Sequence, residues 1–193
     1  MPSQRLVAGE WPREELGRGL ELAGKTLGIV GLGSIGSTSA RKARALDMRV
    51  IAADPYLPDG NENWNLATKV PLHELLAQSD VVTVHCPLNR ETRGLIGTAQ
   101  MQRMKKGAIL INSARGGIVD EAACADALKG GHLGGAALDV FDYEPIKPEA
   151  GKMFAGIPNV ILTPHISGVT REANDRVSYV TVDSVARVLK KGR

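Results

Sequence analysis

The chain has 193 residues, of which 43% are hydrophobic and 23% charged, a composition typical of a globular domain with its own core. The net charge is only +3, the basic residues are dispersed and aromatic residues make up 4%, so nothing indicates nucleic-acid binding. There is no membrane-length apolar run or signal-peptide pattern, and Cys86 and Cys124 lack metal-ligand spacing, so we expect a cytoplasmic protein without a metal site.

Apolar runs alternate with helical patterns along almost the whole chain. Strands are predicted at residues 25–33, 49–54, 80–87, 108–114, 135–141 and 159–164, and helices at 34–46, 71–80, 98–107, 120–131 and 170–191. Nearly continuous apolar strands separated by helices predict an α/β fold, a doubly wound parallel sheet of the Rossmann type with both faces covered. Ligands of such sheets bind beyond the carboxyl ends of the strands, so polar residues at those ends are the candidates for function.

Two local features of the predicted helices can be checked against a structure. In the helix at 34–46, the pattern places Ile35 and the small residues on one side and the basic residues on the other. Asp120 is expected to be the N-cap of the helix at 120–131.

The segment Gly31-Leu32-Gly33-Ser34-Ile35-Gly36 has the spacing G-x-G-x-x-G between a predicted strand and a predicted helix. In a dinucleotide site, Gly31 permits the tight turn, Gly33 lets the backbone approach a pyrophosphate and Gly36 lets the helix pack on the strand. The N–H groups of the first helical turn would then bind the phosphates. Glycine-rich turns also occur for packing reasons, so the motif alone is a weak signal.

Asp54 strengthens the dinucleotide hypothesis because it ends the second predicted strand, eighteen positions after Gly36. A carboxylate there can accept hydrogen bonds from the ribose hydroxyls and would repel a 2′-phosphate. Pro55 and Tyr56 follow, so no arginine stands beside Asp54 to bind that phosphate. These residues favour NAD over NADP; the alternative is an aspartate that merely ends a strand.

Four polar residues, Arg115, Asp139, Glu144 and His165, follow later strands and are expected at the same edge of the sheet as the glycine turn. Each has an ordinary structural alternative: a surface arginine, a turn glutamate or a structural histidine. An arginine, a histidine and a carboxylate together near a nicotinamide indicate hydride transfer to a carbonyl group. His73, which lies within a predicted helix, and His132, which lies in a glycine-rich turn, are assigned structural roles.

The motifs "GLGSIG" with Asp54, "NSARGGIVDE", "ALDVFDYEP" and "TPHISGVTREAN" resemble the D-isomer-specific 2-hydroxyacid dehydrogenase family, closest to its phosphoglycerate dehydrogenase-like branch. The resemblance runs from about Trp11 to the C-terminus. It implies that Arg115 binds the substrate carboxylate, that His165 exchanges a proton with the C2 oxygen, and that Glu144 fixes the imidazole tautomer and favours its protonated form. It also implies that the cofactor is contacted by Asp139 at the nicotinamide carboxamide, by His85, Cys86, Pro87 and Thr92 on the adenosine side, and by Ser113, Ala114, Ser167 and Gly168 near the nicotinamide.

The sequence departs from the family in the chain before the fingerprint, where members carry a substrate lobe. Residues 1–24 resemble only the hinge helix and dimer arm, and residues 25–193 the NAD-binding catalytic domain. We therefore expect NAD binding to survive in this chain and turnover to be weak or absent. Trp11 in the arm implies a homodimer. Smaller departures are Asp47, where the family usually has glycine, and Ser39, where a small apolar residue is commoner.

Two other functions remain open at this stage: an NADH-sensing corepressor module, which can retain the same triad, and an S-adenosylmethionine-binding domain, in which the triad has no role. The substrate is also open among phosphoglycerate, sulfolactate, glycerate or hydroxypyruvate, and lactate-like acids. The "GGIVDE" and "HISGVTREAN" stretches favour the phosphoglycerate branch.

Overall fold

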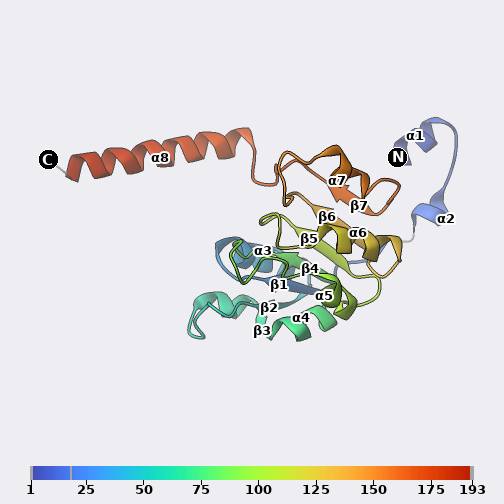
Figure 1. Ribbon diagram of the computed structural model, residues 1–193, viewed down its shortest axis with the longest axis horizontal. Coiled ribbons are helices and arrows are strands. Elements are labelled where there is room, and N and C mark those ends of the chain that lie inside the picture. The colour runs from blue at the N-terminus through green and yellow to red at the C-terminus, as the bar shows by residue number, and fades with distance from the viewer. Residues whose placement is uncertain (1, 18, 192–193) are drawn as a thin grey trace.

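The computed structural model describes residues 2–17 and 19–191 (Figure 1). The expected 1–24 and 25–193 segments therefore include four residues, at positions 1, 18, 192 and 193, that lie outside the described ones.

A seven-stranded parallel sheet forms the body of the protein, with strand order β3-β2-β1-β4-β5-β6-β7. Its strands are β1 (Thr26–Val30), β2 (Arg49–Ala53), β3 (Thr68–Lys69), β4 (Val81–Val84), β5 (Ile109–Asn112), β6 (Gly135–Leu138) and β7 (Val160–Leu162). The helices are α1 (Pro2–Val7), α2 (Arg13–Leu16), α3 (Ser34–Arg44), the 3-10 helix η1 (Glu62–Leu66), α4 (Leu72–Gln78), α5 (Thr98–Arg103), α6 (Glu121–Lys129), α7 (Pro148–Lys152) and α8 (Arg171–Lys191). This architecture confirms the predicted doubly wound fold, in which the order of strand addition reverses between β1 and β4.

Helix α3 covers one face of the β1–β2 half of the sheet, where its buried residues are all small: Gly36, Ser37, Ala40 and Ala43. Small side chains let the helix lie close to the strands. The placement of Ile35 with these residues was wrong, since its side chain is 66% exposed. Ile35 stands in the first turn of α3, which projects beyond the carboxyl end of β1.

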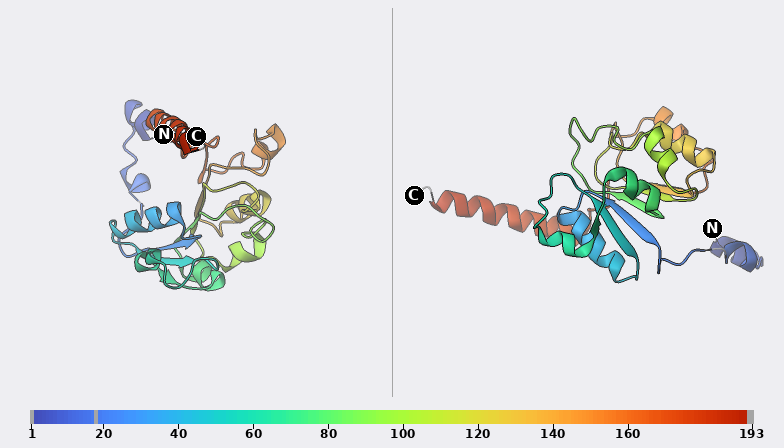
Figure 2. Two further views of the ribbon diagram at one scale, coloured as in Figure 1. Left: turned by 90° about the vertical axis from the view of Figure 1, so that its left-hand side faces the viewer. Right: turned by 90° about the horizontal axis from the view of Figure 1, so that it is seen from below.

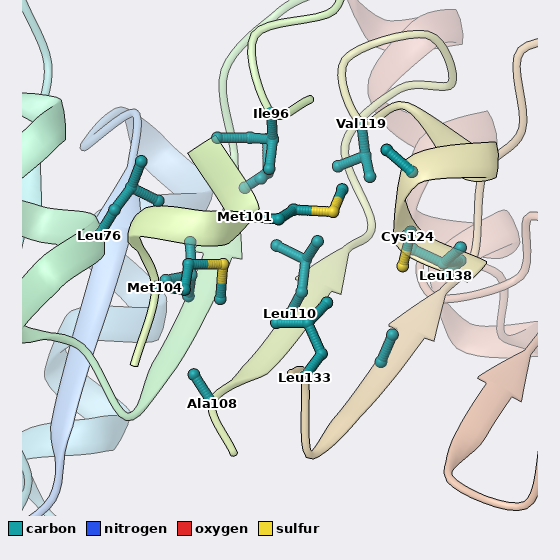
Figure 3. Packing of buried hydrophobic residues seen from close by; sticks show 14 of the residues in the cluster. Leu76, Ile96, Met101, Met104, Ala108, Leu110, Val119, Cys124, Leu133 and Leu138 are labelled. Atoms are coloured by element: carbon teal, nitrogen blue, oxygen red, sulfur yellow. The ribbon is translucent and has the colours of Figure 1, made fainter. Parts of the chain in front are cut away.

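Helices α4, α5 and α6 cover the other face and enclose the larger core cluster (Figure 3). Leu110 of β5 is fully buried there, and Met101 of α5 and Leu133 are each 1% exposed. Asp120 caps α6 as predicted, because its carboxylate accepts a hydrogen bond from the Ala123 amide at 3.0 Å. Helix α5 ends four residues earlier than predicted, since Met104 has an extended backbone.

The expectation that both faces of the sheet are covered fails for the β5–β7 half. On the side of α3, Ile109 of β5 is 38% exposed and Ile161 of β7 is 66% exposed. Ile111 and Ala137, which pair across β5 and β6, are half-buried on the same face. We call this face, made by Ile109, Ile111, Ala137 and Ile161, the open sheet face.

The two ends of the chain project from the body in opposite directions along its longest axis (Figure 1, Figure 2). Helices α1 and α2 lie at one end, and Trp11 between them is 79% exposed. The 21-residue helix α8 leaves the body at the other end. Among the described residues no helix is long and apolar enough to cross a membrane.

Candidate active site

The glycine turn joins β1 to α3, and its geometry requires glycine at two of its three positions. Gly31 has a positive φ of 92°, and a Cβ built on it would lie 2.8 Å from the Cys86 amide nitrogen. A Cβ on Gly36 would lie 2.1 Å from the Gly31 carbonyl oxygen. A Cβ on Gly33 would meet nothing within 4 Å, so the space over Gly33 is open to a ligand.

The first turn of α3 and Asp54 provide the groups that a dinucleotide needs. The N–H groups of Ser34, Ile35 and Gly36 lie in a first helical turn, which leaves them without carbonyl partners inside the helix. Asp54 follows β2 and accepts a hydrogen bond from the Leu32 amide at 2.9 Å, so the carboxylate lies directly beside the glycine turn. The open backbone at Gly33, these donors and this acceptor fit the pyrophosphate and ribose of NAD.

The turn after β4 packs against the glycine turn through the Cys86 backbone. His85 is half-buried, and burial lowers its pKa; its Nε2 lies 3.1 Å from the Thr83 hydroxyl and 3.3 Å from that of Ser39. Burial raises the pKa of the Cys86 thiol, which argues against a nucleophilic role. Thr92 donates its hydroxyl hydrogen to the Pro87 carbonyl at 2.6 Å and so closes this loop.

Arg115 follows β5 in a turn held by the buried Asn112. The Asn112 side chain accepts a hydrogen bond from the Ala114 amide at 3.1 Å and donates one to the Arg115 carbonyl at 3.0 Å. Asn112 was not among the predicted site residues, although a polar residue that ends an apolar strand was an available signal. The Arg115 guanidinium is exposed, with Nη1 donating to the Ala114 carbonyl at 2.6 Å. Ser113 and Ala114 are half-buried in the same turn.

Glu144 and His165 form the one pair of predicted catalytic residues that are in direct contact. Glu144 Oε2 lies 2.7 Å from His165 Nδ1, and Glu144 Oε1 accepts a hydrogen bond from the Phe141 amide at 2.9 Å. The bond with His165, followed by that from Phe141, lowers the pKa of Glu144. A carboxylate on Nδ1 leaves Nε2 as the nitrogen that faces a substrate.

Asp139 directly follows β6 and organises the loop that carries His165. Burial alone would raise its pKa, but hydrogen bonds from Thr163, Ser167 and Ile166 outweigh burial and hold the pKa at about 2. The Asp139 carbonyl also accepts a hydrogen bond from the His165 amide at 2.8 Å. His165 has a φ of 55°, a left-handed conformation that the surrounding hydrogen bonds must stabilise.

The predicted residues thus lie at one edge of the sheet, in loops after β1, β2, β4, β5, β6 and β7. The exposed Ser167 and Gly168 follow His165 in the last of these loops. His73 is exposed in the first turn of α4 and has no hydrogen bond among the described residues. His132 bonds the Met101 carbonyl at 2.9 Å, as a structural histidine would. Cofactor contacts of Asp139, Thr92 and the other predicted residues stay predictions.

Comparisons with known proteins show which family the chain is similar to. Residues 2–167 match the family model described as D-isomer specific 2-hydroxyacid dehydrogenase, NAD binding domain. The chain is 47% identical over 190 residues to (S)-sulfolactate dehydrogenase of Chromohalobacter salexigens, which covers 98% of this chain and 60% of that relative. It is 43% identical over 182 residues to D-3-phosphoglycerate dehydrogenase of Archaeoglobus fulgidus, covering 94% of this chain and 34% of the relative.

A solved structure gives the same result at the level of the fold. The NAD-complexed D-isomer specific 2-hydroxyacid dehydrogenase of Lactobacillus delbrueckii ssp. bulgaricus superposes with a TM-score of 0.83 at 32% identity, over 95% of this chain and 58% of that chain. The present chain therefore spans 60% or less of the length of the proteins described here.

Proposed function

The chain belongs to the D-isomer specific 2-hydroxyacid dehydrogenase family, of which it carries the NAD-binding domain, and from this premise we propose that the protein transfers a hydride between NAD and C2 of a 2-hydroxy or 2-keto acid. The observation that carries the proposal is the 2.7 Å contact between Glu144 and His165 at the edge where the glycine turn lies. A histidine whose Nδ1 is held by a carboxylate is arranged to move a proton at Nε2.

The residues of this chain divide the chemistry between binding and proton transfer. Arg115 binds the substrate carboxylate, for which a planar guanidinium is suited because it can donate two parallel hydrogen bonds. His165 gives a proton to the C2 oxygen during reduction and takes it back during oxidation. Glu144 holds the imidazole with Nε2 directed at that oxygen. The cofactor supplies or accepts the hydride when bound.

The substrate class we favour is a three-carbon 2-hydroxy acid with a second anionic group, of the phosphoglycerate or sulfolactate kind. The support is the similarity to an (S)-sulfolactate dehydrogenase and a D-3-phosphoglycerate dehydrogenase. The NADH-sensing alternative gains no separate support from the site geometry.

The first test is calorimetric titration of the chain with NADH and, in parallel, with NADPH. We expect NADH to bind more tightly, because the Asp54 carboxylate repels a 2′-phosphate. Asp54→Asn should reduce the preference about tenfold, an order that loss of one charge interaction can produce. Asp59→Asn is the control, since Asp59 is an exposed aspartate that follows the same strand. Binding of neither cofactor would refute the assignment of the site.

The second test concerns Arg115 and His165. Oxidation of NADH is followed at high chain concentration with phosphohydroxypyruvate, sulfopyruvate, hydroxypyruvate and pyruvate. We expect at most a slow rate, and any rate should be lost in His165→Asn. Where no rate is seen, binding of the keto acid to the NADH complex is measured instead. Loss of this binding in Arg115→Met would support the role of Arg115 in binding the substrate carboxylate. A rate that His165→Asn leaves unchanged, or keto acid binding that Arg115→Met leaves unchanged, would contradict the assigned roles.

We also propose that the protein forms a homodimer in the cytoplasm. Trp11 and the open sheet face are exposed apolar surfaces of the kind that a second copy covers. The dimer is tested by measuring the molecular mass of the chain, and of a variant that carries both Trp11→Ser and Ile161→Ser, by sedimentation. Identical monomeric behaviour of both proteins would contradict it.

A further inference from the structure

Arg93 lies where three loops of the active-site edge meet. Its Nη1 donates to Asp142 Oδ1 at 2.9 Å, which joins the loop after β4 to the loop after β6. The Gly94 amide donates to the Gly117 carbonyl at 2.7 Å, which joins the first of these loops to the turn after Arg115. Both side chains of the ion pair are partly exposed, so the pair on its own contributes little to stability.

The ion pair lies directly on the backbone of the turn that follows Arg115. A Cβ on Gly117 would be 2.7 Å from Asp142 Oδ1 and 2.8 Å from Arg93 Nη1. A Cβ on Gly116 would be 1.8 Å from the Phe141 carbonyl oxygen. The two glycines therefore let the Arg115 turn lie flat against residues 141–142, with the ion pair packed on Gly117.

The same residues 141–142 begin the turn that carries Glu144. The Asp142 amide donates to Glu121 Oε1 at 2.6 Å, and the Phe141 amide donates to Glu144 Oε1. Asp142 is thus held by Arg93 through its side chain and by Glu121 through its backbone. Its neighbour Phe141 fixes one oxygen of the carboxylate whose other oxygen contacts His165.

The charges around this turn are mainly negative. Burial first, and then the charges of Asp142, Asp120 and Glu144, raise the pKa of Glu121. Arg93 is the cation that forms an ion pair within this group among the described residues. Without it, the carboxylates would repel one another and push the turn apart.

We propose that Arg93 is a positioning residue for the proposed dehydrogenase reaction: by pairing with Asp142 it holds the 141–144 turn so that Glu144 stays on His165 Nδ1. The catalytic purpose of this arrangement rests on the proposed function. The coupling between the Arg93–Asp142 pair and the Glu144–His165 contact can be measured without it. Arg93 acts through Asp142, and among the described residues it has no hydrogen bond or ion pair with His165 or Glu144.

The test is the tautomer of His165 in the chain, measured by long-range ¹H–¹⁵N spectra at a pH where the imidazole is neutral. Only four histidines are present, and His165→Asn assigns the resonance. In the parent chain Glu144 should hold the proton on Nδ1, whereas a free imidazole prefers it on Nε2. Arg93→Met should reduce the Nδ1–H fraction at least about twofold, and Arg93→Lys should restore much of it.

Arg90→Met is the matched control, because Arg90 is an exposed arginine of the same loop for which the described part of the chain shows no hydrogen bond or ion pair. It removes the same charge and should leave the tautomer unchanged. Asp142→Asn removes the ion pair together with one of the repelling carboxylates, so its effect should be smaller than that of Arg93→Met, and Arg93→Met added to it should change the tautomer little further. An unchanged tautomer in both single variants, or an equal change in Arg90→Met, would overturn the proposal.

Two further measurements distinguish a change at His165 from general unfolding or loss of the cofactor site. Circular dichroism should show each variant folded, and NADH affinity should stay within about twofold of the parent, since Arg93 lies outside the glycine turn. Because the tautomer needs neither substrate nor turnover, its result is separate from any failure of the proposed reaction.

Discussion

Replacing Asp139 by asparagine should destabilise the domain by an amount that depends on pH in a defined way. Asp139 is 5% exposed and its pKa is held at about 2, against an ordinary value of 3.8. Since one pKa unit corresponds to about 1.4 kcal/mol, the ionised carboxylate stabilises the fold by about 2 kcal/mol at neutral pH. Asparagine removes this contribution, because its neutral amide accepts hydrogen bonds more weakly.

The sign of the pH dependence follows from the direction of the shift. A carboxyl group with a depressed pKa stabilises the fold above its ordinary value and loses that effect as the pH falls toward the depressed one. The difference in unfolding free energy between parent and Asp139→Asn should therefore be about 2 kcal/mol at about pH 7 and about 1 kcal/mol at about pH 3.

Urea unfolding followed by circular dichroism over this pH range measures the difference, provided that the slope against denaturant stays constant. Asp126→Asn is the control, since Asp126 is an exposed aspartate on α6, and it should change stability by less than about 0.5 kcal/mol throughout. A difference for Asp139→Asn that is the same in acid as at neutral pH would refute the reasoning, because it would trace the loss to packing rather than to charge.

Other substitutions test the core, the backbone and the thiols. Leu110→Ala removes a fully buried side chain and should lower the unfolding free energy by about 3 kcal/mol in urea titrations; a loss under 1 kcal/mol would mean that the core collapses around the site. Asp47 has a φ of 57°, so Asp47→Gly should raise the thermal midpoint by relieving a strain of about 1 kcal/mol, and a lower midpoint would contradict this. Alkylation should reach the half-buried Cys86 first, more slowly with NADH bound, while burial raises the pKa of Cys124 to about 12 and keeps it unreactive; equal rates for both thiols would exclude this order.

The fold could be predicted from the sequence because each strand other than β3 lies in an apolar run that is followed by a glycine, a proline or a polar residue. The edge strand β3 could not, since it has two residues, both exposed, and exists only by pairing with β2. The open sheet face could not be predicted either, because β5 has the same apolar pattern whether or not a helix covers it. The exposed side chain of Ile35 shows a different limit: at a helix terminus, the hydrophobic pattern says little about which residues are buried.

The candidate catalytic residues could be predicted from their place after strands, together with a resemblance that sets their order. Their supports could not, because these are pairs between distant segments: Arg93 and Asp142 are 49 residues apart, and Thr163 and Asp139 are 24 apart. Either partner of such a pair resembles an ordinary loop residue until the chain is folded. The sequence therefore indicates which side chains meet the ligand more readily than which ones hold them.

The exposure of helix α8 has a consequence for its local stability in solution. None of its residues from Arg171 to Lys190 is buried, and valine, which favours strands, occurs five times along it. A helix that buries so little of its surface is only marginally stable in water. Its amide hydrogens should then exchange with solvent almost as fast as those of a free peptide, while the amides of β4 and β5 exchange only through global unfolding. A surface that packs on α8 would therefore stabilise its helical state, and the stability of the sheet would not change.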